Sequence, residues 1–100
     1  MDSEAVALPD GRIRLFVDGV QIGKIRSFTS ENGIDFAADD APAIDGTFPN
    51  VVQLPDGRYR MYVTRFFGND GAPGSGESKI ISFVSDDALN WRQEKGFRTT

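Results

Sequence analysis

Two segments of the chain combine acids, amides and aromatic rings, the side chains with which proteins commonly bind sugars. The first segment carries Asp45, Phe48 and Asn50. The second contributes a guanidinium, two adjacent phenyl rings, an amide and a carboxylate: Arg65, Phe66, Phe67, Asn69 and Asp70. Aromatic faces stack on the apolar faces of sugar rings, and carboxylates and amides hydrogen-bond to hydroxyl groups. We therefore take these residues as candidates for ligand binding, with Asp45 as the one candidate for a catalytic carboxylate.

The composition excludes several kinds of chemistry. The chain has neither Cys nor His, which rules out thiol nucleophiles, disulfides, thiolate or imidazole metal sites and His-based triads. Its net charge of −4 disfavours nucleic acid and anionic membranes, because both bind basic faces. Asp and Asn oxygens are abundant, but no loop has the ligand spacing of a calcium site, so we expect no cofactor and no metal. Without a signal-peptide pattern or an apolar run near the roughly 20 residues of a membrane helix, we expect a soluble protein of unknown location.

The elements that must position these residues are repeated within the chain. The sequence Leu-Pro-Asp-Gly-Arg occurs at 8–12 and again at 54–58, followed by strand-like runs at 13–17 and 59–63. The segments 24–33 and 79–88 form a second matching pair. The separation between copies grows from 46 residues at Leu8 and Leu54 to 55 residues at Phe28 and Phe83, which indicates a nine-residue insertion. We place it in a Gly-rich loop over 64–78, and loops of this length are usually functional or mobile.

The repeated unit predicts an all-β fold. Apolar residues alternate with a period near two, and turn residues interrupt them about every eight to twelve positions. We expect strands at about 4–8, 12–18, 23–29 and 34–38, and again at about 50–54, 58–64, 79–85 and 90–95. Each Leu-Pro-Asp-Gly turn is expected to join two antiparallel strands, because Pro presets φ, Asp bonds its own backbone and Gly accepts a positive φ. The two copies, residues 1–46 and 47–100, should form one structural unit.

Each unit resembles a four-stranded antiparallel blade of a β-propeller. The segments 30–36 and 85–91 fit Ser-x-Asp/Asn-Gly-x-x-aromatic, which resembles the Asp-box turn of sialidase-like propellers. Ala88 stands where this pattern has Gly, and it should be strained if its φ is positive. The segment 48–63 is similar to blades of the five-bladed arabinanase, levansucrase and invertase group of glycoside hydrolases, which typically show Asp-Pro-x-Val-Val before Leu-x-Asp-Gly-x-Tyr-x-Met-Tyr. This chain has Phe48 where that motif carries Asp.

The propeller resemblance implies a functional face. The linker 37–50 and the loop 64–78 should converge on it, which adds Asp39 and Asp40 to the candidates above. The turn acids should lie on the opposite face and serve structure: Asp10, Asp56, Asp86 and Asp87. Two aromatic residues are expected in the core between blades: Phe36 and Trp91. Arg14 and Arg60 alternate with apolar neighbours, and we expect them to pair with acids of the adjacent blade.

Two blades are too few to close a propeller ring, and they would leave apolar faces and sheet edges open. We therefore expect self-association into a homodimer or homotrimer with a ring of four or six blades. The expected function is non-catalytic, lectin-like carbohydrate binding through this oligomeric ring. The alternative is a glycoside hydrolase-like fragment or symmetric assembly acting on furanoside-type glycans, which would need two carboxyl groups about the scissile bond. A scaffold without a small-molecule ligand is a third possibility.

Overall fold

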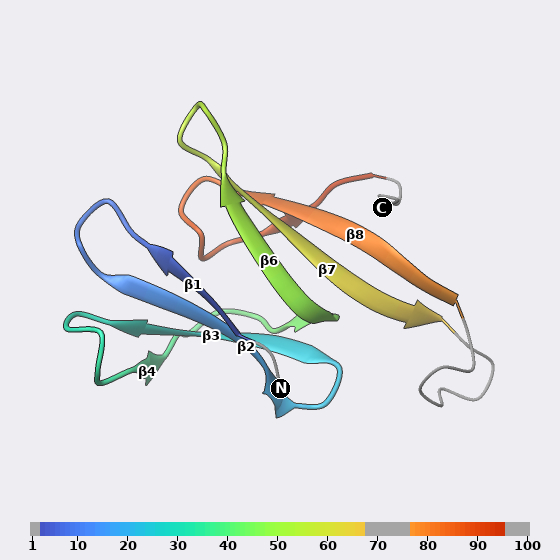
Figure 1. Ribbon diagram of the computed structural model, residues 1–100, viewed down its shortest axis with the longest axis horizontal. Helices are drawn as coiled ribbons and strands as arrows, with labels where there is room; N and C mark the ends of the chain where they lie inside the picture. Colours follow the sequence, from blue (N-terminus) through green and yellow to red (C-terminus); the bar gives the residue numbers. More distant parts are fainter. Residues whose placement is uncertain (1–2, 68–76, 96–100) are drawn as a thin grey trace.

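The computed structural model describes residues 3–67 and 77–95, which form two antiparallel β-sheets (Figure 1). The first sheet has the order β1 (Ser3–Ala7), β2 (Ile13–Gln21), β3 (Lys24–Ser30) and β4 (Ala37–Ala38), and β5 (Ile44–Asp45) pairs with the other end of β3. The second sheet has the order β6 (Thr47–Gln53), β7 (Tyr59–Phe67), β8 (Glu77–Ser85) and β9 (Arg92–Gln93). The described residues contain no helix, so the all-β prediction is confirmed.

The observed strands depart from the predicted ones in three places. The fourth strand of each sheet is a two-residue strand. The predicted loop over 64–78 is wrong at both ends, because β7 continues to Phe67 and pairs it with Glu77 of β8. Thr64, Arg65 and the two phenylalanines that follow are compatible with strand, and the hairpin therefore extends into the insertion. The short strand β5 was not predicted, since two residues carry no periodicity.

The two Leu-Pro-Asp-Gly turns have the same hydrogen bonds. In each turn the Gly N–H donates to the Leu carbonyl, at 3.0 Å in the first copy and 2.9 Å in the second. In each turn the Asp carboxylate also accepts the Arg backbone N–H at 3.0 Å. Gly11 and Gly57 have φ of 92° and 93°, a conformation that favours glycine. The predicted structural role of Asp10 and Asp56 is therefore confirmed.

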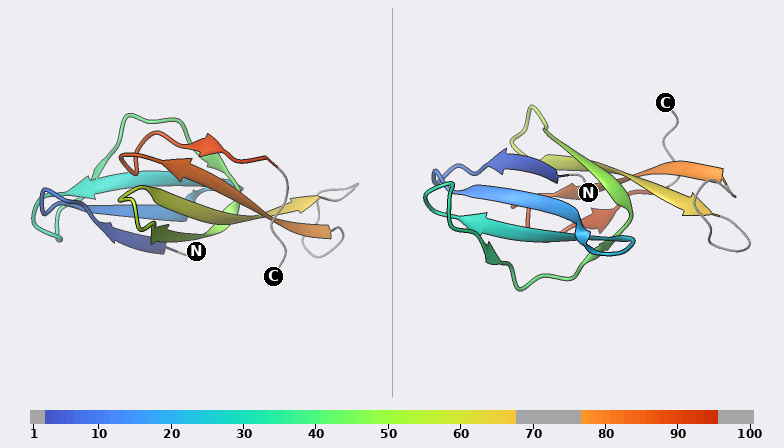
Figure 2. Two further views of the ribbon diagram at one scale, coloured as in Figure 1. Left: turned by 90° about the horizontal axis from the view of Figure 1, so that it is seen from above. Right: turned by 60° about the horizontal axis from the view of Figure 1, so that its bottom comes forward.

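The sheets pack against each other through one face of each, with β1 beside β6 (Figures 1 and 2). Alternate residues of the first sheet, including Phe16 and Ile25, enter this core. They meet Met61, Val63 and Ile81 of the second sheet, all of which are buried. The far ends of β7 and β8 extend beyond the first sheet (Figure 2). Among the described residues, no further sheet packs on the remaining face of either sheet.

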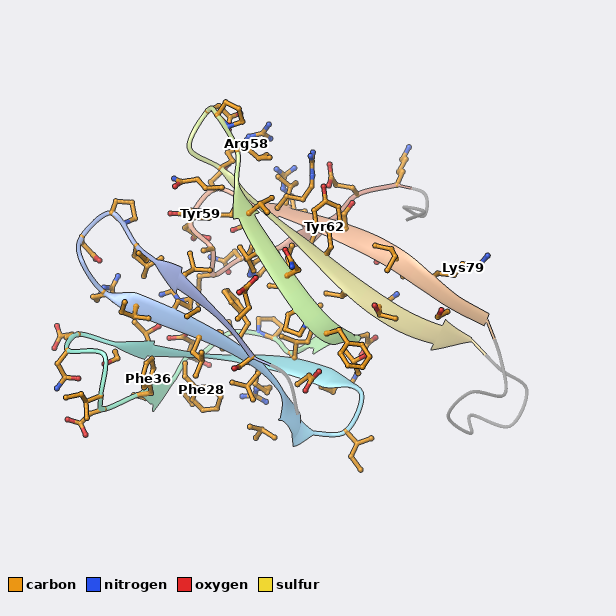
Figure 3. The ribbon with its side chains drawn as sticks, viewed as in Figure 1. Phe28, Phe36, Arg58, Tyr59, Tyr62 and Lys79 are labelled. Atoms are coloured by element: carbon orange, nitrogen blue, oxygen red, sulfur yellow. The ribbon has the colours of Figure 1, made fainter. Side chains whose placement is uncertain are left out.

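The aromatic residues expected between the sheets have different surroundings. Trp91 packs edge-on against Phe16 of the first sheet, with ring centroids 5.6 Å apart and an interplanar angle of 78°, as predicted. Phe36, its counterpart in the first copy, does not lie between the sheets and is 37% exposed. The reason is positional: Phe36 and Phe28 lie on the side of the first sheet that faces away from the second (Figure 3).

The two strand arginines pair within their own sheets, so the prediction of acids from the adjacent sheet is wrong. Arg14 lies 3.2 Å from Asp39 (Nε to Oδ2), and Arg60 lies 2.8 Å from Glu94 (Nε to Oε1). Each acid follows the fourth strand, and its backbone N–H donates to a carbonyl of the third strand, which brings the acid back over the sheet. Arg14 does contact the second sheet, but through the backbone carbonyl of Asp87, at 3.1 Å from Nη1.

Candidate functional site

Asp45 is held at the edge of the first sheet by pairing with β3. It lies opposite Lys24 in the β3–β5 ladder, and its carboxylate forms an ion pair with the Lys24 ammonium group. This hydrogen bond from Lys24 is the main reason that the pKa of Asp45 lies below its usual value, and the positive charge of Arg65 acts in the same direction. A carboxylate held ionised in this way is suited to accept hydrogen bonds and unsuited to act as a general acid.

Arg65 connects this edge to the second sheet. It projects from β7, and its Nη2 and Nε donate to the backbone carbonyl of Asp45 at 2.9 and 3.3 Å. The linker between the sheets is therefore held at Asp45 from both sides, by Lys24 of the first sheet and Arg65 of the second. The structure thus brings together Asp45 and Arg65, two of the predicted ligand-binding residues.

A pocket of about 320 Å³ lies next to this pair, between the linker and the outer strand of the second sheet. We call it the linker pocket. Its lining combines an indole and a phenyl ring, two amides and the Asp45–Arg65 pair with apolar linker residues: Pro42, Ala43, Ile44, Asp45, Arg65, Phe83, Leu89, Asn90, Trp91 and Gln93. The indole nitrogen of Trp91 is buried without a hydrogen-bond partner, so the side-chain surface that Trp91 presents to the pocket is apolar.

The residues of the linker pocket that were not predicted lie at the end of the segment 85–91 and directly after it. Asn90 and Gln93 are not among the residues predicted for the site, and Trp91 is predicted only as a core residue. Asn90 donates from Nδ2 to Asp87 at 3.0 Å, which fixes the orientation of its amide. The apolar periodicity could not have indicated them, because their proximity to the linker depends on the packing of distant segments.

A second, shallower pocket of about 300 Å³ lies on the other side of the Asp45–Arg65 pair. It is lined by Gly23, Gly46, Thr47 and Thr64 together with the same two charged residues. Asp45 and Arg65 therefore separate two hollows at this rim. Asp45 is the one carboxylate among the described residues that line either of them.

Phe48, another of the predicted ligand-binding residues, has an unusual backbone conformation. Its φ is 53°, a left-handed conformation that is uncommon for an aromatic residue, and its side chain is 53% exposed. Its N–H donates to Oδ2 of the buried Asp18 in the first sheet at 2.9 Å. Asp18 was also missed by sequence reasoning, although an acid directly after an apolar strand run is a recognisable signal. The strained Phe48 backbone is thus stabilised from the neighbouring sheet.

Of the other predicted ligand-binding residues, Asn50 does not join this rim. Asn50 is exposed on β6 and pairs with Tyr62, on the face of the second sheet that points away from the first. Phe66 and Phe67 end β7, and Asn69 and Asp70 lie outside the described residues. Two linker acids were also expected here. Asp39 instead accepts hydrogen bonds from Thr29 and Arg14 on the first sheet, and the exposed Asp40 lines neither pocket.

A larger hollow of about 450 Å³ lies at the opposite end, between the turns of the two sheets. Most of its charged lining is already used by the fold. Asp10 bonds its own turn, and Arg14 bonds Thr29, Asp39 and the Asp87 carbonyl. Asp87 accepts the backbone N–H groups of Leu89 and Asn90, both at 2.9 Å, and the Asn90 bond is the main reason that its pKa is strongly lowered. We therefore regard the linker pocket as the better candidate for a ligand.

The described residues contain no group of three or more His, Cys, Asp or Glu side chains that could hold a metal ion. The part of the chain that the structure describes has no helix long and apolar enough to cross a membrane. No protein-family model, curated protein or solved structure matches the sequence.

Proposed function

We propose that this protein binds carbohydrate non-catalytically in the linker pocket. The observation that supports the proposal is the lining of this pocket, where apolar aromatic surface, two amides and an ion-paired carboxylate face one space. Apolar ring surface and oriented hydrogen-bonding groups together match the alternating apolar and hydroxyl surfaces of a sugar. The pocket volume of about 320 Å³ suits one or two sugar units bound at a chain end.

We further propose that the two sheets are propeller blades. Each has four consecutive antiparallel strands, and the sheets lie side by side. Their third-to-fourth connections carry matching bonds: the Ser30 and Ser85 hydroxyls each accept the Asx N–H at 3.2 Å, and the Asx side chains accept two further N–H groups. These bonds are what the likeness to an Asp-box turn leads one to expect.

The geometry favours binding over hydrolysis. Hydrolysis of a glycosidic bond normally requires two carboxyl groups, one of which must donate a proton. Asp45 is the single carboxylate of the described residues lining the two rim pockets, and its pKa is lowered by Lys24. The aspartate position of the resembled enzymes is occupied by Phe48.

The test is a glycan array containing arabinans, fructans and xylans, followed by titration of the bound sugar. Asp45→Asn should weaken binding about tenfold, corresponding to about 1.4 kcal/mol, because a charged acceptor is replaced by a neutral one. Asp40→Asn is the matched control, since Asp40 lies in the same linker and is exposed outside the pocket. The proposal is wrong if no glycan binds, or if the two variants lose affinity equally.

The same proteins should be assayed with chromogenic arabinosides, fructosides and xylosides. Binding without turnover supports the proposal. Turnover that Asp45→Asn abolishes and Asp40→Asn retains would instead establish the hydrolase alternative and overturn the binding-only function.

A further inference from the structure

The two sheets are copies of one unit, and they contact each other through opposite faces of that unit. The face that the first sheet buries in this contact is therefore open on the second sheet, and the face that the second sheet buries is open on the first. At the interface between them, Arg14 and Phe16 of the first sheet meet the second sheet at Asp87 and Trp91. The counterparts of Arg14 and Phe16 in the second sheet are Arg60 and Tyr62. Both lie on the face of the second sheet that points away from the first.

The first sheet shows the complementary situation. The counterparts of Asp87 and Trp91 are Asn32 and Phe36, and no sheet of the described residues packs against them. Phe36 lies next to Phe28 on this open face (Figure 3), and Phe36 is 37% exposed. Apolar surface of this kind on one side of a sheet is normally covered in a stable protein.

We infer that these two open faces bind each other between copies of this chain, head to tail. The interface would repeat the contact already present between the two sheets of one chain. Arg60 would donate to the Asn32 carbonyl of a second copy, as Arg14 donates to the Asp87 carbonyl at 3.1 Å. Tyr62 would pack edge-on against Phe36 of that copy, as Phe16 packs against Trp91 with centroids 5.6 Å apart.

The burial of the two arginine–acid pairs agrees with this inference. Both arginines pair with an acid of their own sheet, yet the Arg14 side chain is 6% exposed and the Arg60 side chain 29%. The difference arises because the second sheet covers Arg14, whereas no sheet formed by the described residues covers Arg60. Arg60 is nevertheless fully organised, with bonds to both carboxylate oxygens of Glu94 at 2.8 and 3.0 Å. The open face is thus built like the covered one.

The partner is a second copy because the two open faces carry the counterparts of Arg14, Phe16, Asp87 and Trp91, which form the two sides of an existing interface. A head-to-tail interface uses different patches on the two partners, and it continues until the ring closes. Self-complementary contact between two identical faces would instead place Phe36 against Phe36 and leave Arg60 uncovered. This inference does not depend on sugar binding.

Light scattering after gel filtration tests the inference with the unmodified chain and three variants. The wild type should be a closed oligomer at micromolar concentration. Phe36→Asp and Tyr62→Asp should each give folded monomers, because a charge is placed on one of the two open faces. Ile22→Asp is the control, since Ile22 is 98% exposed in the β2–β3 turn outside both faces, and it should leave the oligomer intact.

Mixing the two monomeric variants gives the decisive result. Head-to-tail binding predicts a one-to-one heterodimer, because Phe36→Asp retains the second-sheet face and Tyr62→Asp retains the first-sheet face. Should either variant fail to fold, the chain's lack of cysteine allows a second measurement: Asn32→Cys with Arg60→Cys should be joined between chains by a short bismaleimide. A wild type that stays a folded monomer, or mixed variants that do not associate, would overturn the inference, as would the absence of interchain cross-links.

Discussion

The two Ser–Asx turns carry different residues at the same left-handed position, and exchanging them separates backbone strain from burial. Gly33 has φ of 78° and Ala88 has φ of 60°, so the condition under which strain is expected at Ala88 is met. For a residue with a Cβ, this conformation costs about 1–2 kcal/mol. The informative variants are therefore Gly33→Ala and Ala88→Gly, each of which gives one turn the residue of the other.

The expected effects differ because only one of the two positions is buried. At Gly33 an added methyl would have no heavy atom within 4 Å, so it gains no packing. The smaller entropy of the unfolded chain offsets about 0.4–1 kcal/mol of the strain. We therefore expect Gly33→Ala to lower the free energy of unfolding by about 0.5–1 kcal/mol.

Ala88→Gly relieves the same strain but also removes favourable terms. Ala88 is 0% exposed and belongs to the hydrophobic core, so losing its methyl costs about 0.8 kcal/mol. The greater conformational freedom of glycine in the unfolded chain lowers the free energy of unfolding by a further amount of about 0.4–1 kcal/mol. These losses cancel the relief, and the free energy of unfolding should change by less than about 0.5 kcal/mol.

Urea denaturation followed by the fluorescence of Trp91, the chain's one tryptophan, measures both effects. With a slope of roughly 1–3 kcal/mol per molar urea, Gly33→Ala should lower the midpoint by about 0.2–1 M while Ala88→Gly leaves it nearly unchanged. The reasoning is refuted if Ala88→Gly stabilises the protein by more than about 1.5 kcal/mol, because the buried methyl would then contribute nothing. An unchanged midpoint for Gly33→Ala would equally refute it.

Three further predictions concern the linker, acid stability and the buried arginine. Gly46→Ala should destabilise the protein by more than about 2 kcal/mol in urea denaturation, since φ is 143° and the new Cβ would lie 2.9 Å from a Val63 methyl. The lowered pKa of Asp87 contributes stability that is full above its ordinary value of 3.8 and is lost as pH falls through its folded pKa. The advantage of wild type over Asp87→Asn should thus shrink below about pH 4, as read from urea midpoints across pH. Arg14→Met should cost about 3 kcal/mol or more in thermal or urea unfolding, because it leaves buried acceptors unpaired; a loss below 1 kcal/mol would contradict that account.

Much of the fold was predictable from the sequence because it depends on local chemistry. The Leu-Pro-Asp-Gly turns form through bonds among five consecutive residues, and the positive φ at Ala88 follows from its place in a Ser–Asx turn. Strand positions follow from the alternation of apolar side chains. The end of β7 was missed because Gly and Ser in the insertion mask a strand that continues as far as Phe67.

The candidate site was only partly predictable because it depends on contacts between distant segments. The sequence placed Asp45 and Arg65 on a common rim, and the structure joins them through the Asp45 carbonyl. It could not indicate that Asn90 and Gln93 lie across a pocket from the linker, because no local pattern encodes that proximity. It also could not reveal that Asn50 lies on the far face of the second sheet.

The sequence by itself determined the repeated unit, its strands and its turns, since these depend on residues close together in the chain. The tertiary structure decided which faces of the two sheets meet and which stay open. Arg14 and Arg60 occupy corresponding positions of the repeat and each pairs with an acid of its own sheet, yet their side chains are 6% and 29% exposed. This difference in exposure depends on how the two sheets are placed in space. The repeat specifies the same unit twice, but each sheet packs against the other through one face only.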